Sequence, residues 1–497
     1  MNRIERKMIN MWASLGPKFL PFSNVATPDL PLGRLLRLSL FQVSVGMALV
    51  LLVGTLNRVM IVELDVPASL VGIMLALPVL AAPFRAMIGH KSDTHRCELG
   101  WRRVPFIWKG TLLQFGGFAF MPFALLVLAG KGESASVPAF VGQLSAGLAF
   151  LLVGAGVHTV QTAGLALATD LSPPDRQPQV VGLMYVMLLL GMMASALAFG
   201  VALENFTPGR LVQVIQAAAV ITVLLNVIAM WKQETRNPPR GAKVMTKDPT
   251  FRESWANFCE GTHAIRRLVI VGLGTMAFGM ADILLEPFGG EVLGMPVSAT
   301  TKLTALLALG GLLGFSYASY ALGEGRAGLA YRLAQTGALI GLPSFVLVIA
   351  AIPADMVVLF VIGNFGIGFG AALFGHGTLT AAMNRAPRDQ VGLALGSWGA
   401  VQATAAGVGI ALSGAMRDLV QLAMNNSEGF FGFPVVASGY LAVYALEMIL
   451  LVVTIVASLP LIRQALDNLN SNGATARQNF VTEPARVLSQ ADGEKAI

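Results

Sequence analysis

The feature that most constrains this chain is a series of long apolar runs separated by short polar breaks. A helix needs about 20 apolar residues to cross the roughly 30 Å hydrocarbon core of a bilayer. Twelve runs of about that length lie near positions 35–61, 69–89, 104–128, 139–168, 177–201, 211–231, 266–286, 299–321, 327–350, 355–383, 389–415 and 434–462. Because a backbone in lipid must satisfy its hydrogen bonds internally, these runs predict an all-α membrane protein with twelve transmembrane helices.

The basic residues are gathered on one side of the predicted membrane. With the N-terminus inside, 27 of the 34 lysines and arginines fall in cytoplasmic segments or at cytoplasmic span ends. This bias predicts that both termini are cytoplasmic. It also accounts for the net charge of +7, because the cytoplasmic leaflet is anionic, and it gives no support for a nucleic-acid partner.

The longest polar break divides the spans into two groups of six. We predict a cytoplasmic amphipathic arm, an N-terminal six-helix half, a cytoplasmic central loop, a C-terminal six-helix half and a disordered cytoplasmic tail. Their bounds are 1–34, 35–231, 232–265, 266–463 and 464–497. The arm alternates basic and apolar residues, as does a helix that lies on a membrane surface, and the tail is polar.

Short sequences recur at equivalent places in the two halves. Pro67 and Ser69 follow the first span as Pro296 and Ser298 follow the seventh. A Val-Gly-Leu sequence follows both the fourth and the tenth span. Two six-span halves related by such a repeat predict the major facilitator fold.

The loop GHKSDTHRCELGWRR (89–103) resembles the inner-loop motif of the major facilitator superfamily. The residues that carry this resemblance are Gly89, Asp93, Arg102 and Arg103. The resemblance implies that Asp93 bonds a helix N-terminus or an arginine and locks one conformation, with Arg85 as a candidate partner. The alternative is that Asp93 is simply solvated.

Three longer stretches narrow the resemblance. They read LRLSLFQVSVGMALVLLVGTLNRVMIVEL (36–64), SDTHRCELGWRRVPFIWKGTLLQFGG (92–117) and LLEPFGGEVLGM (284–295). Together they resemble the PucC/LhaA family of bacteriochlorophyll-delivery facilitators, and the resemblance runs over roughly residues 15–462. The segment 16–39 looks closer to the LhaA branch, which serves the core antenna around the reaction centre.

The resemblance implies a light-harvesting complex assembly factor. Such a protein binds or delivers bacteriochlorophyll and helps insert antenna polypeptides into the core antenna ring, and a carotenoid is a second candidate pigment. The implied partners are the antenna alpha and beta polypeptides and membrane lipids, with the reaction-centre core complex and the pigment-synthesis or membrane-insertion machinery as further candidates. The implied location is the bacterial inner membrane, in its intracytoplasmic photosynthetic region, as a multi-pass protein.

Charged residues near the outer ends of two spans are candidate gating residues. The repeat sets Arg58 in the first span against Glu286 in the seventh, which predicts an ion pair that closes the outer side. Asp282 lies one turn deeper on the same helical face, where an ionised carboxylate needs a partner or water. Glu291 is expected to be solvated in the outer loop. The alternative for Arg58 and Glu286 is solvation at the level of the lipid headgroups.

Two histidines lie inside equivalent spans and are candidate pigment ligands. They are His158 in the fourth span and His376 in the tenth, each with glycines nearby that would admit a flat macrocycle. The magnesium of bacteriochlorophyll already has four ring nitrogens, and a neutral imidazole suits its remaining position. The alternative is a histidine that is hydrogen-bonded to a neighbouring helix.

The sequence contains no catalytic set, and we predict that the protein is not an enzyme. Cys97 and Cys259 lie in separate polar loops, without the spacing of a metal site. The glycine-rich run 363–375 has no strand before it, so it indicates close helix packing rather than a phosphate loop.

The alternative function is a proton-coupled secondary transporter of a small solute. Transporters often carry several ionisable groups at the middle of the bilayer. Here the charges cluster at span ends, which favours a lipid-like or pigment ligand. Glu447 in the last span is the main exception and a candidate proton carrier.

Overall fold

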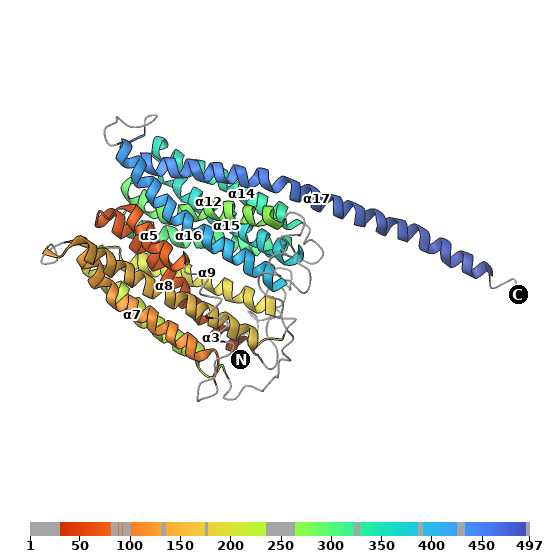
Figure 1. Cartoon of the computed structure of the whole chain (residues 1–497), viewed down its shortest axis with the longest axis horizontal. Coiled ribbons are helices and arrows are strands. Elements are labelled where there is room, and N and C mark those ends of the chain that lie inside the picture. The colour runs from red at the N-terminus through yellow and green to blue at the C-terminus, as the bar shows by residue number, and fades with distance from the viewer. Residues whose placement is uncertain are drawn as a thin grey trace, which may run out of the picture.

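The structure is a computed structural model. It describes residues 30–80, 101–130, 136–173, 177–234, 264–322, 329–385, 391–424 and 433–493, together with residues 88 and 92. The predictions for most of the amphipathic arm, Arg85, Gly89 and Asp93 fall outside these residues. The described part is a bundle of long helices arranged as two groups (Figure 1).

The first group is the N-terminal half. Its elements are α3 (Leu32–Leu38), α4 (Leu40–Leu49), the π-helical stretches η1 (Val50–Leu56) and η2 (Val59–Glu63), α5 (Ala68–Leu80), α7 (Val104–Ala129), α8 (Ala139–Asp170), α9 (Gln177–Ala202) and α10 (Pro208–Met230). The first four follow one another and form the first span. Local signals set the helix ends: the Thr207 hydroxyl accepts the N–H of Arg210 at the start of α10, and Gly130 takes a left-handed φ of 59° after α7.

The second group is the C-terminal half. Its helices are α12 (Ala264–Glu291), α13 (Val297–Ala321), α14 (Ala330–Ala354), α15 (Val357–Arg385), α16 (Val391–Met424) and α17 (Val435–Gly493). Eleven helices in the described residues are long and apolar enough to cross a membrane. The twelfth predicted span, 69–89, corresponds to the shorter apolar helix α5, whose continuation beyond Leu80 lies mostly outside the described residues.

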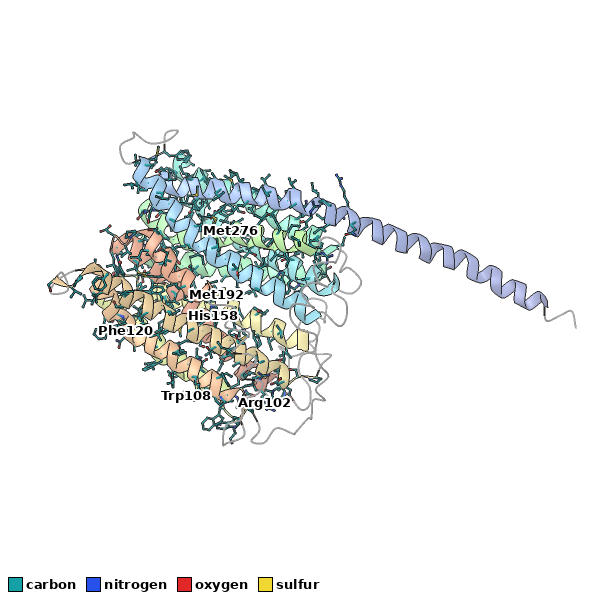
Figure 2. All side chains as sticks on the ribbon, in the orientation of Figure 1. Arg102, Trp108, Phe120, His158, Met192 and Met276 are labelled. Atoms are coloured by element: carbon teal, nitrogen blue, oxygen red, sulfur yellow. The ribbon has the colours of Figure 1, made fainter. Side chains whose placement is uncertain are left out.

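The halves meet where α5 packs on α16, where α9 packs on α13, and where the first span packs on both α12 and α13. Small residues permit this approach, since a Cβ added to Gly72 on α5 would lie 2.9 Å from the carbonyl oxygen of Ile410 on α16. Large apolar side chains such as Trp108 and Phe120 on α7 instead point outward, where lipid would cover them (Figure 2).

The tail differs from its prediction. We expected residues 464–497 to be disordered, whereas α17 continues as one helix to Gly493 and projects far beyond the bundle (Figure 1). The last predicted span, 434–462, is the part of this helix that packs on α12, α14 and α16.

Candidate functional site

A cavity of about 680 Å³ lies between the two halves. The N-terminal half contributes Val79, His158 and Tyr185 to its wall. The C-terminal half contributes residues of α12, α13, α15 and α16. The lining residues of α12 lie in its middle, at 275–282, and those of α16 lie in its first half, at 398–406. Because both helices begin on the predicted cytoplasmic side, the cavity occupies the central and cytoplasmic part of the bundle.

The wall of this central cavity is mainly aromatic and small. Phe278 and Phe374 stand against each other with ring centroids 6.1 Å apart, and Trp398 lies nearby with its Nε1 donating to the Thr378 hydroxyl at 3.2 Å. Gly375 and Gly399 also line the cavity, and a Cβ added to either glycine would meet no atom within 4 Å. The wall is therefore open at both glycines.

The two candidate histidines occupy different surroundings. His158 lies midway along α8 and lines the cavity (Figure 2). His376 is not among the lining residues, because its ring packs edge-on against Phe315 with centroids 4.6 Å apart. One position separates Gly375, which faces the cavity, from His376, and one residue turns a helix by about 100°. The predicted equivalence of the two histidines therefore does not extend to the cavity.

Asp282 is the acidic residue of the cavity wall, and its side chain is exposed there. Glu286, one turn further toward the outer side, is only 4% exposed and accepts a hydrogen bond from the Thr304 hydroxyl. Arg58 is 3% exposed, forms an ion pair with Glu63 and donates to the Met295 carbonyl at 3.1 Å. All three predicted gating residues thus lie between the halves.

The predicted direct ion pair between Arg58 and Glu286 is absent from the described residues. The arginine pairs instead with Glu63, five positions later. The wider turn of a π-helix brings residues five apart onto the same face, which a repeat-based alignment does not anticipate. Arg58 still lies against α12, because a Cβ added to Gly290, one turn after Glu286, would be 3.0 Å from the Arg58 guanidinium.

Glu291 was expected to be solvated, and this prediction was wrong. It is paired with Arg417 on α16 and accepts a hydrogen bond from the Tyr440 hydroxyl at 2.7 Å. The Arg417 guanidinium lies 5.0 Å from the centre of the Tyr440 ring and bonds Asp418 at 3.0 Å. These four side chains form what we call the outer cluster.

The outer cluster reaches the opposite half through Asp418. Its carboxylate accepts the backbone N–H groups of Ala68 at 3.3 Å and of Ser69 at 2.7 Å, both in the first turn of α5. A carboxylate at a helix N-terminus satisfies donors that have no partner within the helix and interacts favourably with the helix dipole. Asp418 therefore joins α16 to α5 at the outer side.

A second bond between the halves lies deeper in the membrane. The side-chain nitrogen of Asn57 donates to the Ile283 carbonyl at 2.6 Å. Pro287, four residues after Ile283, has no N–H, so the helix itself leaves this carbonyl without a donor. Asn57 supplies the missing donor from the other half. The sequence signal for this bond was the proline inside the span.

The cytoplasmic motif residues in the described part have structural partners. Arg103 bonds Asp170 at 2.9 Å and Ser92 at 2.6 Å. The backbone N–H groups of Arg102, Arg103 and Val104 all donate to the carboxylate of Glu234. The acid that caps α7 thus comes from the residues after α10.

The helix arrangement and the central cavity define a membrane protein of the major facilitator fold. The nucleoside transporter NupG matches with a TM-score of 0.60 and 11% sequence identity, over 87% of this chain and 99% of that one. A bacterial homologue of the human lysosomal transporter Spinster, inward-facing and unoccupied, matches with a TM-score of 0.59 and 16% identity, over 87% and 95% of the two chains. These similarities establish the fold alone.

The sequence identifies the family. A model described as PUCC protein matches residues 55–466. Protein PucC of Rhodovulum sulfidophilum is 61% identical over 85% of this chain and 93% of its own length, and Protein PucC of Rhodobacter capsulatus is 56% identical over 90% and 96%. The chain therefore belongs to the PucC family, as the three quoted stretches predicted. It is a multi-pass, photosynthesis-related protein of the bacterial inner membrane; the assignment to the LhaA branch stays a prediction.

Proposed function

We propose that this protein carries a bacteriochlorophyll-type pigment in the central cavity and passes it to antenna alpha and beta polypeptides as they assemble. The observation that supports this most directly is the cavity itself, which has an aromatic and glycine-rich wall and one histidine. A more distant relative, 28% identical, is described as the bacteriochlorophyll synthase 44.5 kDa chain of Rhodobacter capsulatus. The role is that of a carrier and assembly factor rather than an enzyme.

The residues of the cavity fit such a ligand. Its volume of about 680 Å³ falls within the roughly 300–1,000 Å³ usual for ligand sites. The openings at Gly375 and Gly399 would admit the edge of a flat ring. His158 would supply an imidazole nitrogen to the ring magnesium, and Phe278 and Phe374 would cover an apolar face. The bound pigment would contribute its absorption of light. The protein would contribute the cavity that encloses the pigment and the histidine that binds its magnesium.

The test is the near-infrared absorption of the full-length protein purified in mild detergent from a pigmented host. We expect a bacteriochlorophyll band in the parent protein, its loss in His158→Ala and its retention in His376→Ala. Gly399→Leu should also remove the band by filling the cavity. Gly116→Leu is the matched control, because that glycine lies exposed on α7 and its added Cβ also meets no atom within 4 Å.

Two outcomes would contradict the proposal. One is a band of equal intensity in His158→Ala and in Gly399→Leu, which would put the pigment outside the cavity. The other is the absence of both pigment and antenna polypeptides from the purified parent protein.

The second outcome would favour a proton-coupled transporter of a small solute. The exposed carboxyl of Asp282 in the cavity is the observation that supports this second candidate. A solute bound by that carboxyl should lose affinity in Asp282→Asn and keep it in His158→Ala.

A further inference from the structure

Glu447 is a buried acid that the pigment proposal does not use. It lies on α17 with none of its surface exposed, and neither carboxyl oxygen has a hydrogen-bond partner within the described part of the chain. An isolated carboxylate away from water is among the most costly groups to bury. The carboxyl group of Glu447 therefore requires a bound cation to be accommodated there.

A second polar group in the same place is also unsatisfied. The Tyr444 hydroxyl, one turn earlier on α17, is fully buried and has no hydrogen-bond partner among the described residues. Tyr444 and Glu447 are three positions apart on α17 and therefore lie on the same face of the helix. Two unpartnered polar side chains thus share one apolar region, where each such group carries a desolvation cost.

Asp282 connects this region to the central cavity. It lies on α12, which packs antiparallel against α17, as the contacts of Glu291 with Tyr440 and of Phe288 with Tyr444 show. At a rise of 1.5 Å per residue from the Phe288–Tyr444 contact, Asp282 lies within about one helical turn of the level of Glu447. Its own side chain is exposed in the cavity, whereas that of Glu447 is not. An ion in the cavity would therefore reach Asp282 first and Glu447 after it.

Neither acid forms an ion pair with a basic side chain among the residues that the structure describes. His158 and Tyr185 line the same cavity as Asp282. The other elements that pack against α12 are α13, α15 and the π-helical part of the first span, and their basic or imidazole groups are Lys302, His376, Arg385 and Arg58. Within the membrane-spanning part of α17, residues 435–464, the other ionisable groups are Tyr440, Tyr444 and, at its far end, Arg463. On α16 they are Arg417 and Asp418, which belong to the outer cluster together with Glu291 of α12. Glu286 of α12 is bonded to Thr304, and Arg266 and Arg267 lie at the start of that helix. On α14 they are Tyr331 and Arg332, in its first turn.

The available oxygens indicate which cation fits. Magnesium and calcium require six or more oxygen ligands. Within the described part of the chain no group of three or more histidine, cysteine or acidic side chains is placed to hold a metal ion. Among the residues described, this region offers only the carboxyl groups of Asp282 and Glu447 and the hydroxyl of Tyr444. A proton needs only one oxygen, so it is the cation that this site can hold.

We infer that Asp282 and Glu447 form a proton-binding pair, in which Asp282 exchanges a proton with the central cavity and Glu447 stores it inside the C-terminal half. The proton moves between carboxyl oxygens and cavity water, and no other bond changes. This inference does not depend on the identity of the ligand in the cavity. If the ligand excludes water from Asp282 when it binds, its affinity will depend on whether the Asp282–Glu447 pair carries the proton.

The test uses dicyclohexylcarbodiimide, which reacts with protonated carboxyl groups in apolar surroundings, on the full-length protein without pigment. Peptide mass spectrometry would follow the adduct at Glu447 across a pH series. We expect labelling of Glu447 that declines as the pH rises. In Asp282→Asn the midpoint of that decline should move to lower pH by roughly one unit, because Glu447 then loses its proton without a negative neighbour.

Two further variants keep the test decisive. Asp282→Glu retains the charge and should keep the parent midpoint, and Asp355→Asn, at an exposed position beyond α14, should keep it as well. No adduct at Glu447 at any pH at which the protein stays folded would overturn the inference. So would an identical midpoint in Asp282→Asn and in the parent. Neither result depends on pigment binding, so failure of this inference is distinguishable from failure of the proposed function.

Discussion

Replacing Asp418 by asparagine should loosen the outer junction between the two halves. The Asp418 carboxylate accepts two backbone N–H groups from the first turn of α5 and is paired with Arg417, while its side chain is 21% exposed. Asparagine keeps one acceptor oxygen of similar shape but removes the negative charge. The change therefore weakens the contact between α16 and α5 but leaves one hydrogen-bond acceptor in place.

The size of the effect follows from these contacts. A hydrogen bond to a charged group contributes about 1.5–3 kcal/mol, against about 0.5–1.5 kcal/mol for a neutral one. Two bonds lose this charge assistance, and partial exposure to solvent reduces the difference. We expect a net loss of about 1–2 kcal/mol, which corresponds to a roughly 5- to 30-fold larger population with the outer side open.

Cysteine accessibility would measure that population. Thr301 on α13 is fully buried and faces Thr55 of the first span at 3.5 Å, so a cysteine there is reachable from outside only when the halves separate. In a chain with Cys97 and Cys259 replaced by serine, Thr301→Cys would be labelled with a membrane-impermeant maleimide added from the outer side. Asp418→Asn should raise the labelling rate roughly 5- to 30-fold.

Asp355→Asn serves as the matched control. Asp355 is an exposed residue that follows α14, and its left-handed φ of 52° also suits asparagine. Its labelling rate should equal that of the parent. An unchanged rate in Asp418→Asn would refute the reasoning, because it would mean that the carboxylate does not hold the halves together.

The remaining predictions concern stability and are measured as thermal unfolding in detergent. Asn57→Ala should lower the free energy of unfolding by about 1–3 kcal/mol, since the Ile283 carbonyl loses its only donor; an unchanged midpoint would mean that water replaces the amide. Glu234→Ala should cost about 1–2 kcal/mol by uncapping α7, and Glu234→Gln, which keeps an acceptor, should cost less; equal losses would contradict capping. Asn226→Leu should destabilise the N-terminal half by about 1–2 kcal/mol, because its amide links two buried hydroxyls on neighbouring helices, and a more stable variant would contradict this role.

The spans and the two-fold organisation could be predicted from the sequence because they depend on local composition. Apolar length sets a transmembrane helix wherever it occurs, and the basic residues at span ends set its direction. The family could be predicted for a similar reason, since the stretches that carry the resemblance are continuous in the chain. His158 could also be predicted as a candidate site residue from local sequence, because it is a polar residue within an apolar run.

The partners of the charged residues could not be predicted in the same way. Arg58 pairs with Glu63 because a π-helical turn changes which residues share a face, and no composition signal marks that turn. Glu291 pairs with Arg417, which lies on a helix more than a hundred residues later in the chain. The surroundings of Glu291 therefore depend on tertiary packing. His376 lies one helical position after Gly375, which lines the cavity, and that one position is enough to turn its side chain away from the cavity.

The bond from Asn57 to the Ile283 carbonyl sets a hydration requirement for any movement that parts the first span from α12. Because of Pro287, the helix cannot replace that donor, and neither can hydrocarbon. A water molecule must therefore enter the gap as the bond breaks, and it must leave again as the bond re-forms. The rate of such a movement should follow the water activity of the medium, so an excluded osmolyte would slow it even where every side chain is intact.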